Sequence, residues 1–262
     1  MSEKGNDSLA RWKPSEDDIR KLMQSNQQFF EPLTKQVQKL YGVIEKKVTH
    51  FRNLNKVLLK YNWFYSFSIP EECYNEIVDA YNSGEDIENK INSFFVRYFT
   101  KDNYSALEKM VKEWNNNPYF KTRMEIINDC VRTLKNEKPG YNPSNVVLPP
   151  LIAQIDGIMT DFIEKEGFKF DKTKKKWISP DGEEISVKKA YQSIKTDLDS
   201  ISEYPNTILL NVLFQSAFHG DELQVLPSFS RHKIMHGESI DYGNIENVIR
   251  AFLILEFLSC LE

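Results

Sequence analysis

The chain has 262 residues, of which 40% are hydrophobic and 27% are charged, a composition typical of a globular protein with one large domain or two small ones. Its 34 basic and 38 acidic residues give a net charge of −4, which argues against a general polyanion binder with a basic domain. Cys73, Cys130 and Cys260 form no Cys-x2-Cys pair, so we expect no zinc site and predict thiols that serve as small apolar residues in a reducing cytosol.

Neither end of the chain is predicted to enter a membrane. Residues 1–13 are polar, so we expect a disordered N-terminus without the apolar stretch of a signal peptide. Residues 245–261 are strongly apolar, but this segment of 17 residues carries Asn247, Arg250 and Glu256. Its length and polar groups favour a buried bundle helix. We therefore expect a cytoplasmic protein with no membrane partner.

Residues 14–138 are predicted to form an N-terminal helical region. Apolar residues recur every three or four positions along much of it, which is typical of amphipathic helices. An aromatic cluster interrupts the helices. It predicts either a base-stacking platform or a connector that faces the core, and the connector is the favoured interpretation. The cluster consists of Trp63, Phe64, Tyr65 and Phe67. The expected helices span 32–59, 70–81, 87–98, 104–115 and 118–134.

Residues 140–262 are predicted to form a second helical domain. An extended link over 141–147 precedes a helix that begins at Leu148 and reaches Ile163. Within that helix, Asp156 belongs either to the solvated face or to a buried site where it orients a cation. The later helices are expected over 188–201, 205–218, 227–237 and 245–261.

A small β element is expected within this domain. Residues 168–186 contain two short runs of β-forming residues and a turn signal at Pro180-Asp181-Gly182, which predict a hairpin or a three-stranded meander. Its tip carries Lys172, Lys174, Lys175 and Lys176, which belong either to a soluble loop, the favoured interpretation, or to a phosphate contact. The predicted fold class is therefore mainly α: a helical bundle with a small β-hairpin insertion near residues 168–186.

The segment from Ser230 to Gly237 carries the residues best suited to chemistry, because it holds two of the four histidines. Arg231 stays positively charged and can hold a phosphate with two parallel donors. His236 can give or take a proton near neutral pH. The alternative is structural: Arg231 and His232 cap helix ends and pair with carboxylates, while His236 packs before a glycine cap. The other two histidines, His50 and His219, have no partner pattern.

This segment resembles the Arg-polar-x3-His motif of the HEPN superfamily, a group of small α-helical domains that includes many metal-independent ribonucleases of toxin–antitoxin and anti-phage systems. The resemblance covers residues 140–262 and also includes Leu148-Pro149-x4-Gln154-Ile155-Asp156-Gly157. The wider run that is similar to an HEPN-like group reads Arg231-His232-x3-His236-Gly237-Glu238-x2-Asp241-Tyr242-Gly243-x2-Glu246-Asn247.

The resemblance implies a metal-independent endoribonuclease that needs no cofactor. The 2′-hydroxyl of RNA would attack the phosphate, His236 would transfer a proton, and Arg231 would hold the non-bridging oxygens. His232 would position the phosphate or the other histidine. Supporting roles would fall to Asp156, Glu238 and Tyr242.

Geometry and family precedent also indicate the partners. Two residues five apart on a regular helix differ in direction by about 140°, so Arg231 and His236 require either a motif at a helix end or two chains that share one cleft. The resemblance implies the second arrangement, a homodimer that acts on RNA, with an antitoxin or a defence-system protein as a further partner. The alternatives are a non-catalytic helical binding or scaffold protein and a nucleotide-sensing domain.

Overall fold

The computed structural model describes residues 15, 17, 21, 39, 47 and 49–260, apart from 85, 137, 175, 186–188, 191–204, 206 and 215–226. The chain divides into two compact units, Met1–Arg52 and Asn53–Glu262. In the first unit, the described residues from position 17 onward are helical. The predicted disordered N-terminus, His219 and nearly all of the predicted helix over 188–201 lie outside the described residues.

The second unit begins with helical residues 53–60 and then the aromatic connector. Trp63 and Phe64 are buried, and the Trp63 ring stacks on Phe95 with ring centroids 4.3 Å apart. Trp63 and Phe64 therefore face the core as predicted, whereas Phe67 of the same cluster is 53% exposed. A 3-10 turn, η1 (Glu71–Tyr74), and helix α2 (Asn75–Ser83) follow, and Gly84 ends α2 with a φ of 72°.

Helix α3 (Ile87–Glu113) corresponds to the two helices expected over 87–98 and 104–115, because non-helical backbone at Lys101–Tyr104 divides it. Asp102, Asn103 and Tyr104 all have positive φ values between 51° and 63°, a conformation that costs energy for residues with a Cβ. A short 3-10 turn, η2 (Trp114–Asn116), follows α3.

Two predicted helix starts are wrong, and both were placed at prolines. Helix α4 (Met124–Lys135) begins well after Pro118, because Asn117 holds the intervening segment in turns: its Oδ1 accepts from the amide of Tyr119, and its Nδ2 donates to the carbonyl of Ser259. Helix α5 (Ser144–Lys165) begins before Leu148 and includes the residues expected as an extended link.

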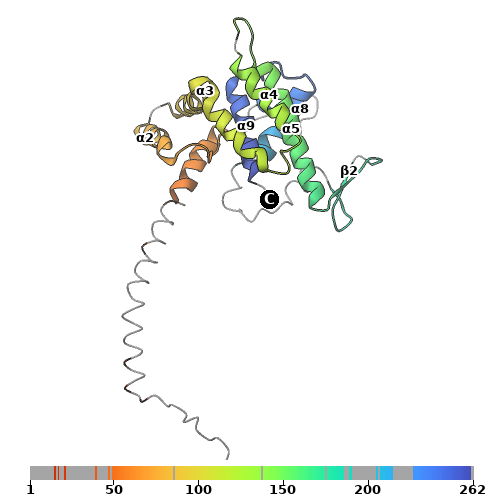
Figure 1. Cartoon of the computed structure of the whole chain (residues 1–262), viewed down its shortest axis with the longest axis horizontal. Helices are drawn as coiled ribbons and strands as arrows, with labels where there is room; N and C mark the ends of the chain where they lie inside the picture. The colour runs from red at the N-terminus through yellow and green to blue at the C-terminus, as the bar shows by residue number, and fades with distance from the viewer. Residues whose placement is uncertain are drawn as a thin grey trace, which may run out of the picture. The chain divides into compact units, whose positions relative to one another are not determined.

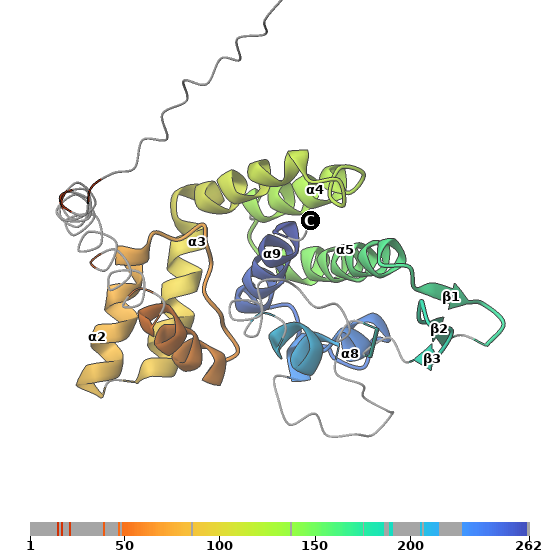
Figure 2. The ribbon, with the colours of Figure 1, turned by 90° about the horizontal axis from the view of Figure 1, so that it is seen from below.

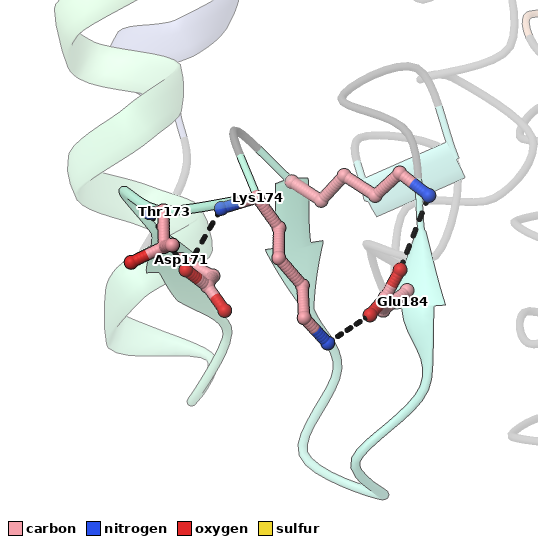
Figure 3. A network of polar contacts seen from close by, with 5 residues as sticks. Asp171, Thr173, Lys174 and Glu184 are labelled. Carbon is pink, nitrogen blue, oxygen red and sulfur yellow. Dashed lines mark hydrogen bonds and ion pairs between the residues drawn. The ribbon is translucent and has the colours of Figure 1, made fainter.

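A three-stranded antiparallel sheet follows α5, in the order β1-β2-β3, which confirms the predicted meander. The strands are β1 (Lys169–Asp171), β2 (Lys176–Ile178) and β3 (Glu184–Ile185). At its tip, the side chain of Glu184 pairs with both Lys174 and Lys176 (Figure 3), and these lysines lower the pKa of the Glu184 carboxyl. Two of the four tip lysines are therefore partly neutralised.

The C-terminal elements complete the core. They are a π-helical turn η3 (Leu209–Leu213), a 3-10 turn η4 (Pro227–Phe229), helix α8 (Arg231–Met235) and helix α9 (Ile245–Ser259). Every residue of α9 from Asn247 to Leu258 is buried, because the helix contacts both α3 and α5, which confirms the predicted buried helix. Figures 1 and 2 show α5 among α4, α8 and α9, with the sheet beyond its C-terminal end.

Among the described residues, α5 alone is long and apolar enough to cross a membrane by length and composition. A buried core helix meets the same criterion, and 56% of the apolar window of α5 is buried inside the protein. The mainly helical architecture with one small sheet confirms the predicted fold class.

The buried carboxyl of Glu256 makes stability depend on pH. Burial raises the pKa of Glu256 above its ordinary value of 4.5, although the amide of Ser68 donates to its Oε1 at 2.8 Å and opposes this effect. The folded protein therefore binds this proton more tightly than the unfolded chain. As a result, the free energy of unfolding contributed by this group falls as pH rises from about 4.5 through the folded-state pKa.

We expect Glu256→Gln to remove that slope, because the amide oxygen still accepts from Ser68 but no longer ionises. Urea denaturation of both proteins from pH 4.5 to pH 7.5 measures the effect. The stability of the Gln variant relative to the parent should increase with pH, and a constant difference would contradict the assignment.

Candidate functional site

Helix α8 presents the Arg231–His236 segment at a helix end. The helix has five residues, His236 is its C-cap, and Gly237 follows with a φ of 73°. The amide of Gly237 donates to the carbonyl of Ile234 at 3.2 Å, and that of Glu238 donates to the carbonyl of Lys233 at 2.8 Å. This pair of hydrogen bonds is a Schellman motif, which confirms Gly237 as the terminating residue and places His236 outside the regular helix.

Arg231 lies against helix α5. Its Nη2 donates to Oδ2 of Asp156 at 2.7 Å, and its guanidinium lies 5.6 Å from the ring centroid of Phe214. Arg231 is 38% exposed and Asp156 is 32% exposed, so solvent and a ligand can both reach the pair. The structure therefore brings Asp156 to the arginine as a carboxylate that orients a cation, one of the two roles expected for it.

The two histidines of the segment lie together. The ring centroids of His232 and His236 are 4.4 Å apart with an interplanar angle of 50°. Nε2 of His232 lies 3.8 Å from Oε1 of Glu238. Their spacing of four positions places both rings on one side of the helix end. One chain thus holds two imidazoles in contact, with a carboxylate beside the first.

The loop after Gly237 is attached to α5 at a backbone carbonyl that Pro149 leaves without its helical hydrogen bond. Because proline has no N–H, the carbonyl of Asn145 lacks its usual helical donor within α5. The hydroxyl of Tyr242 donates to that carbonyl at 3.2 Å. A Cβ on the neighbouring Gly243 would overlap the side-chain amide of Asn145. Tyr242 and Gly243 of the loop therefore both pack against Asn145, the residue of α5 whose carbonyl Pro149 leaves free.

Two further residues, Asn247 and Arg250, support the loop from α9, and neither was predicted to belong to the site. Asn247 is fully buried, and its Nδ2 donates to the carbonyls of Tyr242 and Ser228, both at 3.1 Å. Its Oδ1 accepts from Nη1 of Arg250 at 3.1 Å. Both are polar residues inside an apolar helix, and that contrast is the sequence signal that could have identified them.

Gly157, beside Asp156 on α5, makes room for a second arginine, Arg123 at the N-cap of α4. Arg123 donates to Oε1 of Gln154 at 3.3 Å and to Oδ2 of Asp161 at 2.6 Å. A Cβ on Gly157 would overlap the guanidinium of Arg123. The Gln154-Ile155-Asp156-Gly157 run therefore contacts two arginines, Arg123 and Arg231, through different residues.

We expect Gly157→Ala to give no gain in the free energy of unfolding, because displacing the Arg123 guanidinium from its partners offsets the about 1 kcal/mol that alanine adds over glycine inside a helix. The same substitution in an Arg123→Ala background should be neutral or stabilising, since alanine favours the helix. Thermal denaturation of the four proteins of this double-mutant cycle provides the test. Stabilisation by Gly157→Ala alone would contradict the proposed steric role.

His50 is helical and belongs to the first unit. Within the described part of the chain, no group of three or more His, Cys, Asp or Glu side chains is arranged to hold a metal ion. Of the predicted site residues, the structure pairs Arg231 with Asp156 and places His232 beside His236 and Glu238, whereas the hydroxyl of Tyr242 contacts Asn145 of α5.

Comparisons with protein-family models, with curated proteins and with solved structures find no match for this chain.

Proposed function

We propose that the chain is a metal-independent endoribonuclease of the HEPN type. The observation that carries the proposal is the grouping at α8, where Arg231 is held by Asp156 and the rings of His232 and His236 lie in contact. An arginine and a histidine pair at an accessible helix end are the groups needed to bind a phosphate and move protons. The resemblance of the Arg-polar-x3-His segment supplies the reaction class.

The reaction requires only groups of the RNA and of this chain. The 2′-hydroxyl attacks the adjacent phosphorus as its proton is removed, the bond from phosphorus to the 5′-oxygen breaks, and that oxygen receives a proton. His236 carries one of these proton transfers, as base or as acid. Arg231 stabilises the charge that builds on the non-bridging oxygens. His232, beside Glu238, positions the phosphate or the second imidazole.

Asp156 acts as a positioning residue in this proposal. It fixes one edge of the guanidinium, and the remaining N–H groups of Arg231 stay available to a phosphate because the side chain is 38% exposed. Phosphate oxygens then add to this contact or replace it. The carboxylate does not touch the reacting atoms.

A homodimer completes the proposed site. Met235, on α8, is 49% exposed, and Ile240, in the following loop, is 82% exposed. Exposed apolar side chains that gather in one patch mark protein contacts, and the proposed dimer would bury Met235 and Ile240 in such a patch. A second copy packed here brings a second Arg231 and His236 to the same cleft. An antitoxin or a defence-system protein would bind as a further partner.

The test is incubation of the purified chain with single-stranded RNA in EDTA, followed by analysis of the product ends. We expect cleavage that leaves 2′,3′-cyclic phosphates and that is lost in Arg231→Ala, with partial retention in Arg231→Lys. Cleavage that requires a metal, or that yields no cyclic phosphate, would contradict the proposal.

The same contacts support a second candidate, a non-catalytic helical binding protein. Arg231 and His232 both face carboxylates, Asp156 and Glu238, as expected if they only hold the fold together. In that case the parent protein would not cleave RNA, and the Arg231→Ala and His236→Ala variants would change only the stability of the protein.

A further inference from the structure

The turn before α5 forms a hollow beside the motif loop. Its volume is about 530 Å³, within the range of small-molecule binding sites. The residues that line it are Lys138, Pro139, Tyr141, Asn142 and Pro143. This set combines an aromatic ring, a cation and an amide, the groups that hold nucleotides in single-stranded RNA.

The backbone of this turn is held in one conformation. The amide of Tyr141 donates to the carbonyl of Lys138 at 3.0 Å, and Gly140 has a φ of 78°. A proline at the second position and a glycine with positive φ at the third are typical of a type II turn. Lys138 and Tyr141 therefore stand at fixed positions at the two ends of one rigid turn.

The side chains of the hollow are available to a ligand. Tyr141 is 42% exposed although its ring is apolar. Lys138 is exposed, and among the described residues no carboxylate lies within ion-pair distance of its ammonium group. By contrast, the exposed Lys174 and Lys176 of the hairpin already pair with Glu184. The exposed Lys138 and the exposed ring of Tyr141 thus line the same hollow.

The hollow is joined to the motif loop by direct hydrogen bonds. Nδ2 of Asn142 donates to the carbonyl of Gly243 at 2.6 Å, while Oδ1 of Asn142 accepts from the amide of Ser144 at 3.1 Å. Tyr242 donates to Asn145 one turn further along α5. A ligand in the hollow is therefore held in a fixed relation to the loop that follows His236.

We propose that this hollow binds a nucleotide that flanks the scissile phosphate of single-stranded RNA, with the base stacked on Tyr141 and a backbone phosphate near Lys138. The inference rests on the proposed ribonuclease function for the identity of the ligand. It adds a binding subsite outside the Arg231–His236 segment. Stacking on one aromatic ring accepts any base, so the subsite selects unpaired RNA without reading its sequence.

The test measures binding separately from cleavage. Full-length protein carrying His236→Ala is titrated into a labelled single-stranded oligoribonucleotide, and the dissociation constant is taken from fluorescence anisotropy. We expect Tyr141→Ala to raise the dissociation constant about 10-fold, whereas Tyr141→Phe keeps the ring and stays near the parent value. Lys138→Ala should raise it less and should reduce its dependence on salt concentration.

Tyr81 provides a matched control, because it is a tyrosine of α2 with a similar exposure of 49%. Tyr81→Ala should leave the dissociation constant unchanged. Equal effects of the Tyr81 and Tyr141 substitutions, an unchanged affinity in Tyr141→Ala, or no binding by the parent would each overturn the subsite.

The outcomes distinguish this inference from the proposed function. If the wild-type protein cleaves RNA and the Tyr141→Ala variant binds RNA normally, the subsite is overturned and the proposed ribonuclease function stands. Binding that depends on Tyr141 in a protein that cleaves nothing would support the subsite and overturn the ribonuclease.

Discussion

His236→Ala is expected to lower the rate constant for RNA cleavage by about 100- to 10,000-fold, the range that loss of a general acid or base produces. His236 is exposed and lies at the C-cap of α8, where only its backbone amide takes part in the helical hydrogen bonding, donating to the carbonyl of His232 at 3.0 Å. Removing its ring therefore takes away a proton-transfer group and little packing. The measurement is a single-turnover rate on one RNA together with a thermal denaturation curve.

His50→Ala serves as the control for this variant. It removes an imidazole from a helical residue in the other unit of the chain, and its cleavage rate should equal that of the parent. If His236→Ala kept more than half of the parent rate at unchanged stability, His236 would not be the proton-transfer group.

Arg250→Ala is expected to lower the free energy of unfolding by about 3 kcal/mol. The side chain is 5% exposed, Nε donates to the carbonyl of Asn62 at 3.1 Å, and the guanidinium lies 4.1 Å from the ring centroid of Trp63. Truncation leaves a cavity and two acceptors without donors, and it removes a desolvated cation–π contact. Relief from burying the charge offsets part of this loss.

The charge of Arg250 remains at neutral pH, because burial lowers the pKa of its guanidinium only to about 10. Arg250→Lys keeps the charge without the planar fork and should lie between the parent and Arg250→Ala in urea denaturation. A change below about 1 kcal/mol in Arg250→Ala would contradict the assigned role.

The same arginine links the core to the site. Arg250 donates to Asn247, and Asn247 donates to the carbonyl of Tyr242 in the motif loop. Loss of Arg250 removes one hydrogen bond from the residue that fixes this loop. We therefore expect the cleavage rate of Arg250→Ala to fall even at temperatures where the variant is fully folded.

Periodicity predicted most of the helices, and prolines accounted for the main errors. A proline normally indicates the first turn of a helix, so we expected α5 to start at Leu148. It starts at Ser144 instead. Proline inside α5 is accommodated because the freed carbonyl of Asn145 accepts from Tyr242. That compensation comes from a residue 97 positions away, which local patterns do not reveal.

The helix end at the Arg231–His236 segment was predictable from the sequence, but the contacts of its side chains were not. The spacing of Arg231, His232 and His236 placed them on one segment, and Gly237 correctly indicated its end. The pairing of Arg231 with Asp156 joins residues 75 positions apart, and it depends on how α8 packs against α5. The same holds for Asn247, whose role as the support of the loop follows from tertiary contacts alone.

The most direct measurement uses the 2′-hydroxyl itself. One cleavage position is mapped in a single-stranded RNA, and the same RNA is then made with a single 2′-deoxynucleotide on the 5′ side of that phosphate. In EDTA, we expect wild-type protein to cut the all-ribose strand at this position and to leave the substituted strand intact there. Cleavage at the deoxy position, or an all-ribose strand that stays intact, would contradict catalysis by Arg231 and His236 through 2′-hydroxyl attack.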